Sequence, residues 1–180
     1  MKTNYWFTRN RLLSHVRFAT AVLLACFAAV FISATTPAVA GDQVPFNGTV
    51  SGYGSFLTLP HVVNFGHANQ LGAFTGPAEF YPGSPDPGTG CIPYTGTFDW
   101  FAANGDEIYG TFEGYSCPTD TPGVYDNHET SDVTGGTGRF ASATGHFELG
   151  GLIDFTMLPD FSFVLPWQGT ISTVGSNKRP

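Results

Sequence analysis

The sequence predicts an all-β protein: a single antiparallel meander barrel of about eight strands, with a β-sandwich as the alternative. Apolar residues recur at every second position over most of the chain after residue 40, which is the period of a half-buried strand. All 23 glycines lie in that same part, and glycine marks tight turns and bulges. No segment there repeats apolar residues at helical spacing over three turns. A meander with one apolar face must curl into a barrel or pack on a second sheet.

The alternation justifies the strands in order. The first, 44–53, puts Val44, Phe46 and Val50 on one side, as expected for a half-buried strand or a bent strand pair. In the middle of the chain two alternating runs flank Asn104-Gly105, the strongest short-range hairpin signal. The last two strands alternate over about ten residues each. The predicted strands are 44–53, 56–66, 71–81, 95–103, 107–116, 123–134, 145–156 and 161–173.

Residues 1–40 have the pattern of a cleaved secretory signal. A basic start without acids precedes an apolar run, Phe18–Ile32, of about 15 residues, whereas a spanning helix needs roughly 20. The run leads to an Ala38-x-Ala40 site. Cys26 leaves lipid attachment open as the alternative to cleavage after Ala40. We therefore expect a secreted or periplasmic protein.

The expected domain boundaries follow from that signal. Residues 1–40 are the signal peptide, 41–175 form one β-barrel domain, and 176–180 form a flexible tail. After residue 40 the chain carries three Lys and Arg and fourteen Asp and Glu, so its net charge is 3 − 14 = −11. Without a basic stripe, no nucleic-acid partner is expected, and no membrane partner once the signal is removed.

Cys91 and Cys117 lie on either side of the central hairpin. Folding the hairpin about Asn104 and Gly105 brings residue 117 opposite roughly residue 92. Since an exported chain meets an oxidising compartment, we predict a disulfide that closes the hairpin. A reactive thiol or a metal pair is the alternative, but there is no Cys-x-x-Cys and no basic neighbour.

The stretch "VTGGTGRFASATGHFELGG", 133–151, has glycines at the spacing of a dinucleotide-binding loop. Such a loop needs a buried strand before it and a helix after it. Here "YDNHETSDVT" precedes and a period-two segment follows within five residues, so no crossover helix fits. We predict a connection between strands, in which Gly135, Gly136 and Gly138 allow positive φ, Phe140 is an apolar peg and Gly145 closes the turn. No nucleotide or other cofactor is expected.

Six polar residues are the candidates for a ligand cavity or its rim, although no catalytic role is assigned to any of them. Two histidines share one strand face, but six residues of strand span about 20 Å, too far for one metal ion. No metal site is therefore predicted. The polar strand around residue 128 is explained equally well as a solvent-facing strand. The candidates are His61, His67, Glu79, Tyr81, Asp126 and His128.

The segments "GHANQLGAFTG", "ANGDEIYGTFEG" and "GGTGRFASATG" followed by an alternating strand resemble a group of secreted bacterial proteins of undefined function. That group is assigned to the allene oxide cyclase barrel-like fold, a calycin-type eight-stranded barrel shared with plant dirigent proteins. The resemblance covers most of residues 44–173 and implies a barrel with polar groups inside its cavity. None of those groups is matched to a position here.

Two functions are expected from these observations. The first is non-enzymatic: an exported barrel that binds a small hydrophobic or phenolic molecule, or acts structurally outside the cell. The alternative is a cofactor-free isomerase or cyclase, or a dirigent-like activity, in which the cavity steers a reactive intermediate. Phe101, Tyr109 and Tyr115 on the polar side of the central hairpin suggest a homo-oligomer.

Overall fold

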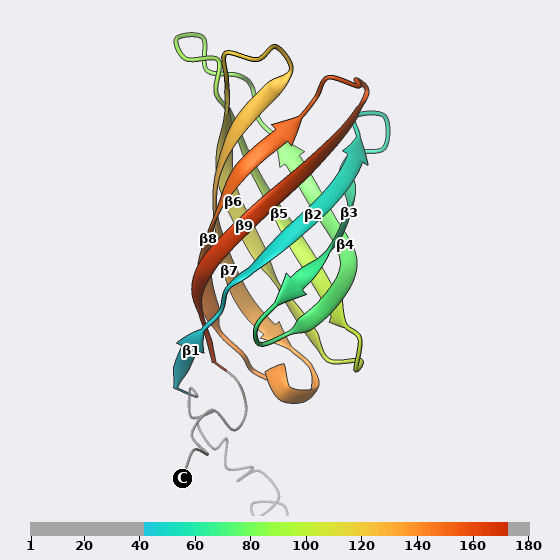
Figure 1. Ribbon diagram of the computed structural model, residues 1–180, viewed down its shortest axis with the longest axis vertical. Helices are drawn as coiled ribbons and strands as arrows, with labels where there is room; N and C mark the ends of the chain where they lie inside the picture. The colour runs from blue at the N-terminus through green and yellow to red at the C-terminus, as the bar shows by residue number, and fades with distance from the viewer. Residues whose placement is uncertain (1–41, 173–180) are drawn as a thin grey trace, which may run out of the picture. The chain divides into compact units, whose positions relative to one another are not determined.

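The computed structural model describes residues 42–172, in which nine strands form one antiparallel sheet that closes on itself (Figure 1). Residues 1–41 and 173–180 lie outside the described part, and with them the predicted signal peptide and tail. The strands are β1 (Gln43–Pro45), β2 (Gly48–Ser55), β3 (His61–Ala68), β4 (Gly72–Pro82), β5 (Ile92–Ala102), β6 (Glu107–Pro118), β7 (Val124–Gly136), β8 (Gly145–Asp154) and β9 (Asp160–Ser172).

Strand β9 closes the barrel because it pairs on both of its edges. It pairs with β2 from Gly48↔Trp167 to Ser55↔Asp160, and with β8 along the other edge. From β2 to β8, each strand pairs with the next strand in sequence. The predicted eight-strand meander barrel is thereby confirmed and the sandwich alternative is wrong. Strand β1 adds three residues that pair with the C-terminal end of β9.

The strand boundaries differ from the prediction mainly at residues 56–60. The sequence alternation predicts a strand from residue 56, but β3 begins only at His61. The Thr58 N–H donates to the Ser55 carbonyl in a turn, and the Leu59-Pro60 bond is cis. Because proline has no N–H to give a ladder, the segment turns rather than pairs. The first predicted strand is divided into β1 and β2, the bent pair that the sequence allowed.

Four connections lie at one end of the barrel, together with the disulfide; we call this the disulfide end (Figure 1). The half of the barrel away from it is filled by aromatic rings. The Trp100 and Trp167 rings lie 5.3 Å apart, and Phe74 stacks on Trp100 at 4.5 Å. Phe46 and Phe147 complete this cluster and are fully buried. This half of the interior is therefore solid.

Glycines on the inner face make room for these and other rings. A Cβ on Gly52 would lie 2.3 Å from the Phe163 ring, and one on Gly96 would lie 2.1 Å from the Phe112 ring. The close approach of ring to backbone thus requires glycine at both positions. The glycine-rich composition serves the packing of a narrow barrel.

The glycine-rich stretch that begins at residue 133 is a strand connection, as predicted. Gly138 has φ +56° and opens a 3₁₀ turn, Gly138–Phe140, in which Phe140 is buried. Strand β8 starts at Gly145, so no helix follows the glycines. Within residues 42–172 this 3₁₀ turn is the only helical element. It is too short to cross a membrane as a helix.

Candidate functional site

A polar cluster lies on the inner face of β5, β6 and β7, near the disulfide end. The Tyr94 hydroxyl donates to Asn127 Oδ1 at 2.6 Å, and the Ser116 hydroxyl donates to the same oxygen at 2.9 Å. All three residues are buried. The Asn127 Nδ2 atom has no hydrogen-bond partner among the described residues. An unpaired buried amide of this kind costs free energy.

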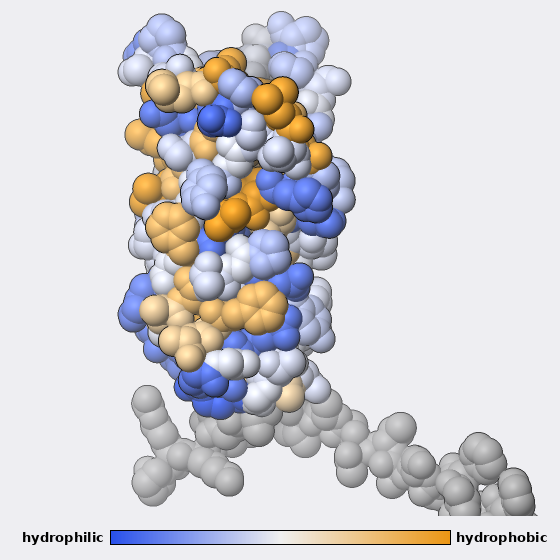
Figure 2. All heavy atoms as spheres, turned by 90° about the vertical axis from the view of Figure 1, so that its right-hand side faces the viewer, coloured by the Kyte–Doolittle hydropathy of each residue, from blue (hydrophilic) through white to orange (hydrophobic). Residues whose placement is uncertain are grey.

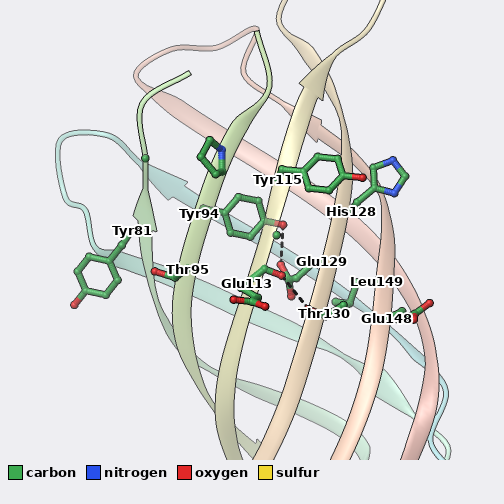
Figure 3. Close-up of a pocket in the computed structure, with 13 residues that line it drawn as sticks. Tyr81, Tyr94, Thr95, Glu113, Tyr115, His128, Glu129, Thr130, Glu148 and Leu149 are labelled. Atoms are coloured by element: carbon green, nitrogen blue, oxygen red, sulfur yellow. Dashed lines mark hydrogen bonds between the residues drawn. The ribbon is translucent and has the colours of Figure 1, made fainter. Parts of the chain in front are cut away.

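Glu129 continues the cluster toward the middle of the barrel. Its Oε2 lies 3.1 Å from the Tyr94 hydroxyl (Figure 3). Its Oε1 accepts from Ser131 at 3.1 Å. Burial raises the pKa of Glu129 to about 7, while the two hydroxyl contacts act in the opposite direction. Burial and the negative charge of Glu129 raise the pKa of Tyr94. A carboxyl group that titrates near neutral pH is suited to proton transfer.

The cluster borders an interior cavity of about 50 Å³ with mostly apolar walls. Tyr94 and Glu129 line it from one side, and Asn64 lines it from β3. In a ring of eight strands β3 and β7 are four places apart in either direction, so they face one another across the barrel. Asn64 is 6% exposed and its Oδ1 has no partner within the described residues. The cavity thus has polar groups on opposite walls.

The cavity limits the size of any ligand. Sites for drug-sized ligands enclose roughly 300–1,000 Å³, several times the space present. Four of the rings that line the cavity point inward but are only partly buried, so this half of the interior is less tightly filled than the other half. A cavity that binds benzene encloses about 150 Å³, so even a single ring enters only if these partly buried rings move apart, and a large molecule would need more movement still. The four rings are Phe80, Phe112, Phe155 and Phe163.

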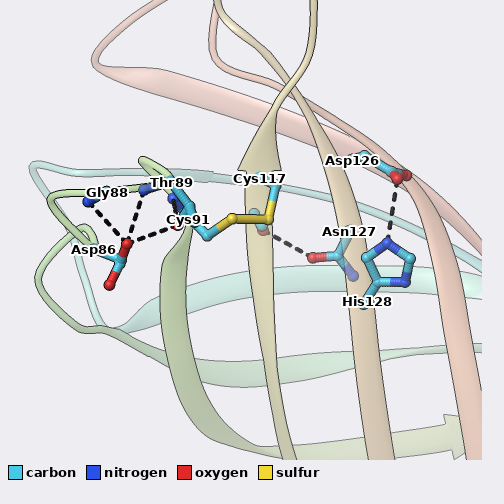
Figure 4. The surroundings of a disulfide bond; sticks show 9 residues. Asp86, Gly88, Thr89, Cys91, Cys117, Asp126, Asn127 and His128 are labelled. Atoms are coloured by element: carbon cyan, nitrogen blue, oxygen red, sulfur yellow. Dashed lines mark hydrogen bonds and ion pairs between the residues drawn. A yellow bond between two sulfur atoms is a disulfide. The ribbon is translucent and has the colours of Figure 1, made fainter.

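The disulfide lies beside the cluster (Figure 4). The sulfur atoms of Cys91 and Cys117 are 2.01 Å apart, a disulfide distance, so the predicted pairing is confirmed. Asp86 holds the preceding loop by accepting from the backbone N–H groups of Gly88 and Thr89. These hydrogen bonds lower the pKa of Asp86. The bond joins the start of β5 to the end of β6, next to Ser116.

The six residues predicted as cavity or rim candidates all lie on strands with their side chains on the outer face of the barrel. Val62, Asn64 and Ala78 occupy the corresponding inward positions of β3 and β4. Two pairs of candidates interact. Tyr81 donates to Glu79 Oε2 at 2.8 Å, and His128 Nε2 lies 3.2 Å from Asp126 Oδ2. His61 and His67 are exposed at opposite ends of β3 and are not brought together.

Two of these candidates, Tyr81 and His128, line a hollow of about 670 Å³ on the outer face of β4 to β8, which we call the outer hollow (Figure 3). The Tyr115 ring stacks on His128 with ring centres 5.2 Å apart. Tyr94, Glu129 and Leu149 line both this hollow and the interior cavity. The two spaces are therefore adjacent and share these three residues.

The sequence interpretation missed the inward-facing polar residues, of which Glu129 lines the cavity. Asn127, Glu129 and Ser131 alternate with the predicted candidates on the same strand, so they belong to the opposite face. The available signal was that residues 126–132 contain no apolar side chain on either face. A barrel strand of this kind must turn polar groups inward. Asn64 gives a similar signal, since it lies between Val62 and Gly66 on one strand face.

No three His, Cys, Asp or Glu side chains between residues 42 and 172 gather closely enough to hold a metal ion. Comparisons of the chain with family models, with curated proteins and with solved structures give no match. The chemistry of the cavity and of the outer hollow is therefore the basis for a functional conclusion.

Proposed function

We propose that this chain is an exported barrel that binds a small, largely apolar molecule with one hydroxyl group, such as a phenol, in its interior cavity. The observation that carries the proposal is the unpaired Asn64 Oδ1, buried on the wall of an otherwise apolar space. An unsatisfied acceptor of this kind is explained by a ligand that donates to it. The aromatic rings around it supply the apolar contact.

The proposal of export rests on the signal-like sequence of residues 1–40 and gains support from the disulfide, which persists in oxidising compartments. The resemblance to allene oxide cyclase-like and dirigent proteins remains part of the proposal. The closed eight-strand barrel is the architecture which that resemblance implies. Polar groups inside the cavity agree with it as well.

Thermal unfolding with phenol and with anisole, its methyl ether, tests the proposal. Phenol can donate to Asn64 Oδ1 and anisole cannot, while their rings are equally apolar. A ligand at about 100 times its dissociation constant stabilises the folded state by about 2.7 kcal/mol. We expect a rise in Tm with phenol, a much smaller rise with anisole, and loss of the difference in Asn64→Leu. Equal behaviour of the two compounds in the native protein would refute the assignment of Asn64.

A second function, a cofactor-free isomerase, is favoured by one observation. Glu129 has a pKa of about 7 and lies 3.1 Å from the Tyr94 hydroxyl at the cavity wall. Such a carboxylate can remove a proton from a carbon next to a carbonyl group. Deuterium exchange into cyclopentanone, followed by NMR, tests this activity. The native protein should accelerate exchange and Glu129→Gln should not; equal rates would exclude Glu129 as the base.

A further inference from the structure

The outer face of β4 to β9 carries a row of polar side chains that runs across the sheet. Cross-strand pairing places each member next to the following one, so the row crosses six strands at about 4.8 Å per strand. Carboxylates and threonine hydroxyls alternate along it, and no two carboxylates are neighbours. The row consists of Tyr81, Thr95, Glu113, Thr130, Glu148 and Gln168.

The first five members of this row line the outer hollow, and aromatic rings stand beside them (Figure 3). The Tyr81 side chain is 50% exposed and Tyr115 is 47% exposed, although both border a concave surface. A second hollow of about 430 Å³ shares four members of the row and extends along the strands to Asp132. The two hollows together form an elongated groove, and its shape suits a chain-like ligand.

Some polar groups of the groove are used within the protein, since Tyr81 donates to Glu79 and the Thr130 hydroxyl donates to the Glu113 carbonyl, but two carboxylates are not. The carboxylates of Glu113 and Glu148 take part in no hydrogen bond or ion pair with the rest of residues 42–172. Arg139 is the one Lys or Arg in that range, and it binds Asp106 near the opposite end. Phosphate and sulfate groups would find no cation here. The groove is therefore suited to a ligand that donates hydrogen bonds and carries no negative charge.

We propose that the outer hollow binds a neutral oligosaccharide. The flat C–H faces of sugar rings pack on exposed tyrosine rings, which combine an apolar face with a polar tip. Sugar hydroxyls donate to the carboxylates and exchange hydrogen bonds with the threonines. The strand spacing is similar to the length of one hexopyranose unit, so successive sugars meet successive members of the row.

A small cation fits these observations less well than a sugar. Glu113 and Glu148 lie two strands apart, about 10 Å, and Thr130 separates them. They therefore cannot both bind one ion, which needs ligands a few ångströms from each other. The half-exposed rings of Tyr81 and Tyr115 have no role in binding a hydrated metal ion.

Calorimetric titration of the native protein with five neutral tetrasaccharides tests this proposal: cellotetraose, xylotetraose, chitotetraose, laminaritetraose and maltotetraose. At least one should bind, and Tyr81→Ala and Tyr115→Ala should each weaken it about tenfold or more. Tyr53 is the matched control, since it is 56% exposed on β2, away from the hollow. Tyr53→Ala should change the affinity by less than about twofold. Tyr81→Phe keeps the ring and should retain binding.

Several results would overturn the proposal. The first is the absence of binding for all five tetrasaccharides at concentrations up to about 5 mM. The second is an equal loss in Tyr53→Ala, because it would move the site away from the hollow. The third is binding of spermidine alone, with an affinity that falls steeply between about 50 and 500 mM NaCl, since that would show a site for cations. Unchanged Tm values of the alanine variants establish that each is folded.

Discussion

Replacing Glu129 by Gln tests whether a carboxyl group inside the barrel titrates near neutral pH. Glutamine keeps the shape of the carboxyl group and, like its protonated form, carries one acceptor and one donor group next to Tyr94 and Ser131. Burial raises the pKa of Glu129 from 4.5 to about 7 in the folded protein. Between these two values the unfolded chain has lost its proton and the folded chain has kept it. The stability of the native protein therefore falls as the pH rises through this window.

The size of the effect follows from the two pKa values. A difference of about 2.5 at about 1.4 kcal/mol for each pKa unit gives about 3 kcal/mol. This figure is an upper bound, because the Glu129 side chain is partly accessible to water. Glu129→Gln should thus match the native protein near about pH 4 and exceed it by up to about 3 kcal/mol near about pH 8. The part of this stability difference that changes with pH reports the charge of Glu129, and the constant part reports the change in shape.

Urea unfolding followed by tryptophan fluorescence measures this difference, since Trp100 and Trp167 are both buried. The disulfide must stay intact in both proteins, so that the unfolded states are comparable. Glu148→Gln is the control for the Glu-to-Gln change itself, because Glu148 lies on the outer face of the barrel. A constant difference between Glu129→Gln and the native protein from about pH 5 to pH 8 would refute an elevated pKa.

Three further predictions concern stability. Serine at both disulfide positions, Cys91 and Cys117, should lower the free energy of unfolding by about 3 kcal/mol, as expected for a link of 26 residues; an unchanged urea midpoint would contradict this. Gly96→Ala should lower the free energy of unfolding by about 2 kcal/mol, because its Cβ would lie 2.1 Å from a backbone oxygen of β4. Gly150→Ala is the control and should be neutral, since the nearest atom there is 3.6 Å away. Equal Tm values for the two variants would refute the packing argument. Asn64→Leu should raise Tm in the absence of ligand, since it removes an unpaired buried oxygen; a fall in Tm would mean that the amide is satisfied.

The barrel could be predicted from the sequence because its period-two pattern is regular, and the disulfide because Asn104-Gly105 determines the hairpin register. The faces of individual strands were harder to assign. On β3, Val63 and Phe65 share a face with the histidines and suggest that this face is buried, yet it is the outer one. Figure 2 shows apolar side chains exposed among polar ones on one side of the barrel. The inner face carries small residues there, since a Cβ on Gly66 would lie 2.7 Å from the Phe74 ring.

The interior polar cluster could not be predicted from the sequence for a related reason. Both faces of residues 126–132 are polar, so alternation cannot tell which one is buried. Only the pairing of β7 with β6 and β8 places Asn127 and Glu129 inside. Tyr94 lies 33 residues from Asn127 in sequence, and no local pattern links the two.

The double pairing of β9 has a consequence for the order of folding. Strands β2 to β8 can zip together as each is added, but the first and the last of them stay open until β9 joins them. Until then both borders offer unpaired N–H and C=O groups, which invite association with other chains. The barrel therefore closes only after β9, the last strand in sequence, is available. Its contacts with β2 are distant in sequence and form slowly. A chain shortened before Asp160 should aggregate instead of yielding a smaller barrel.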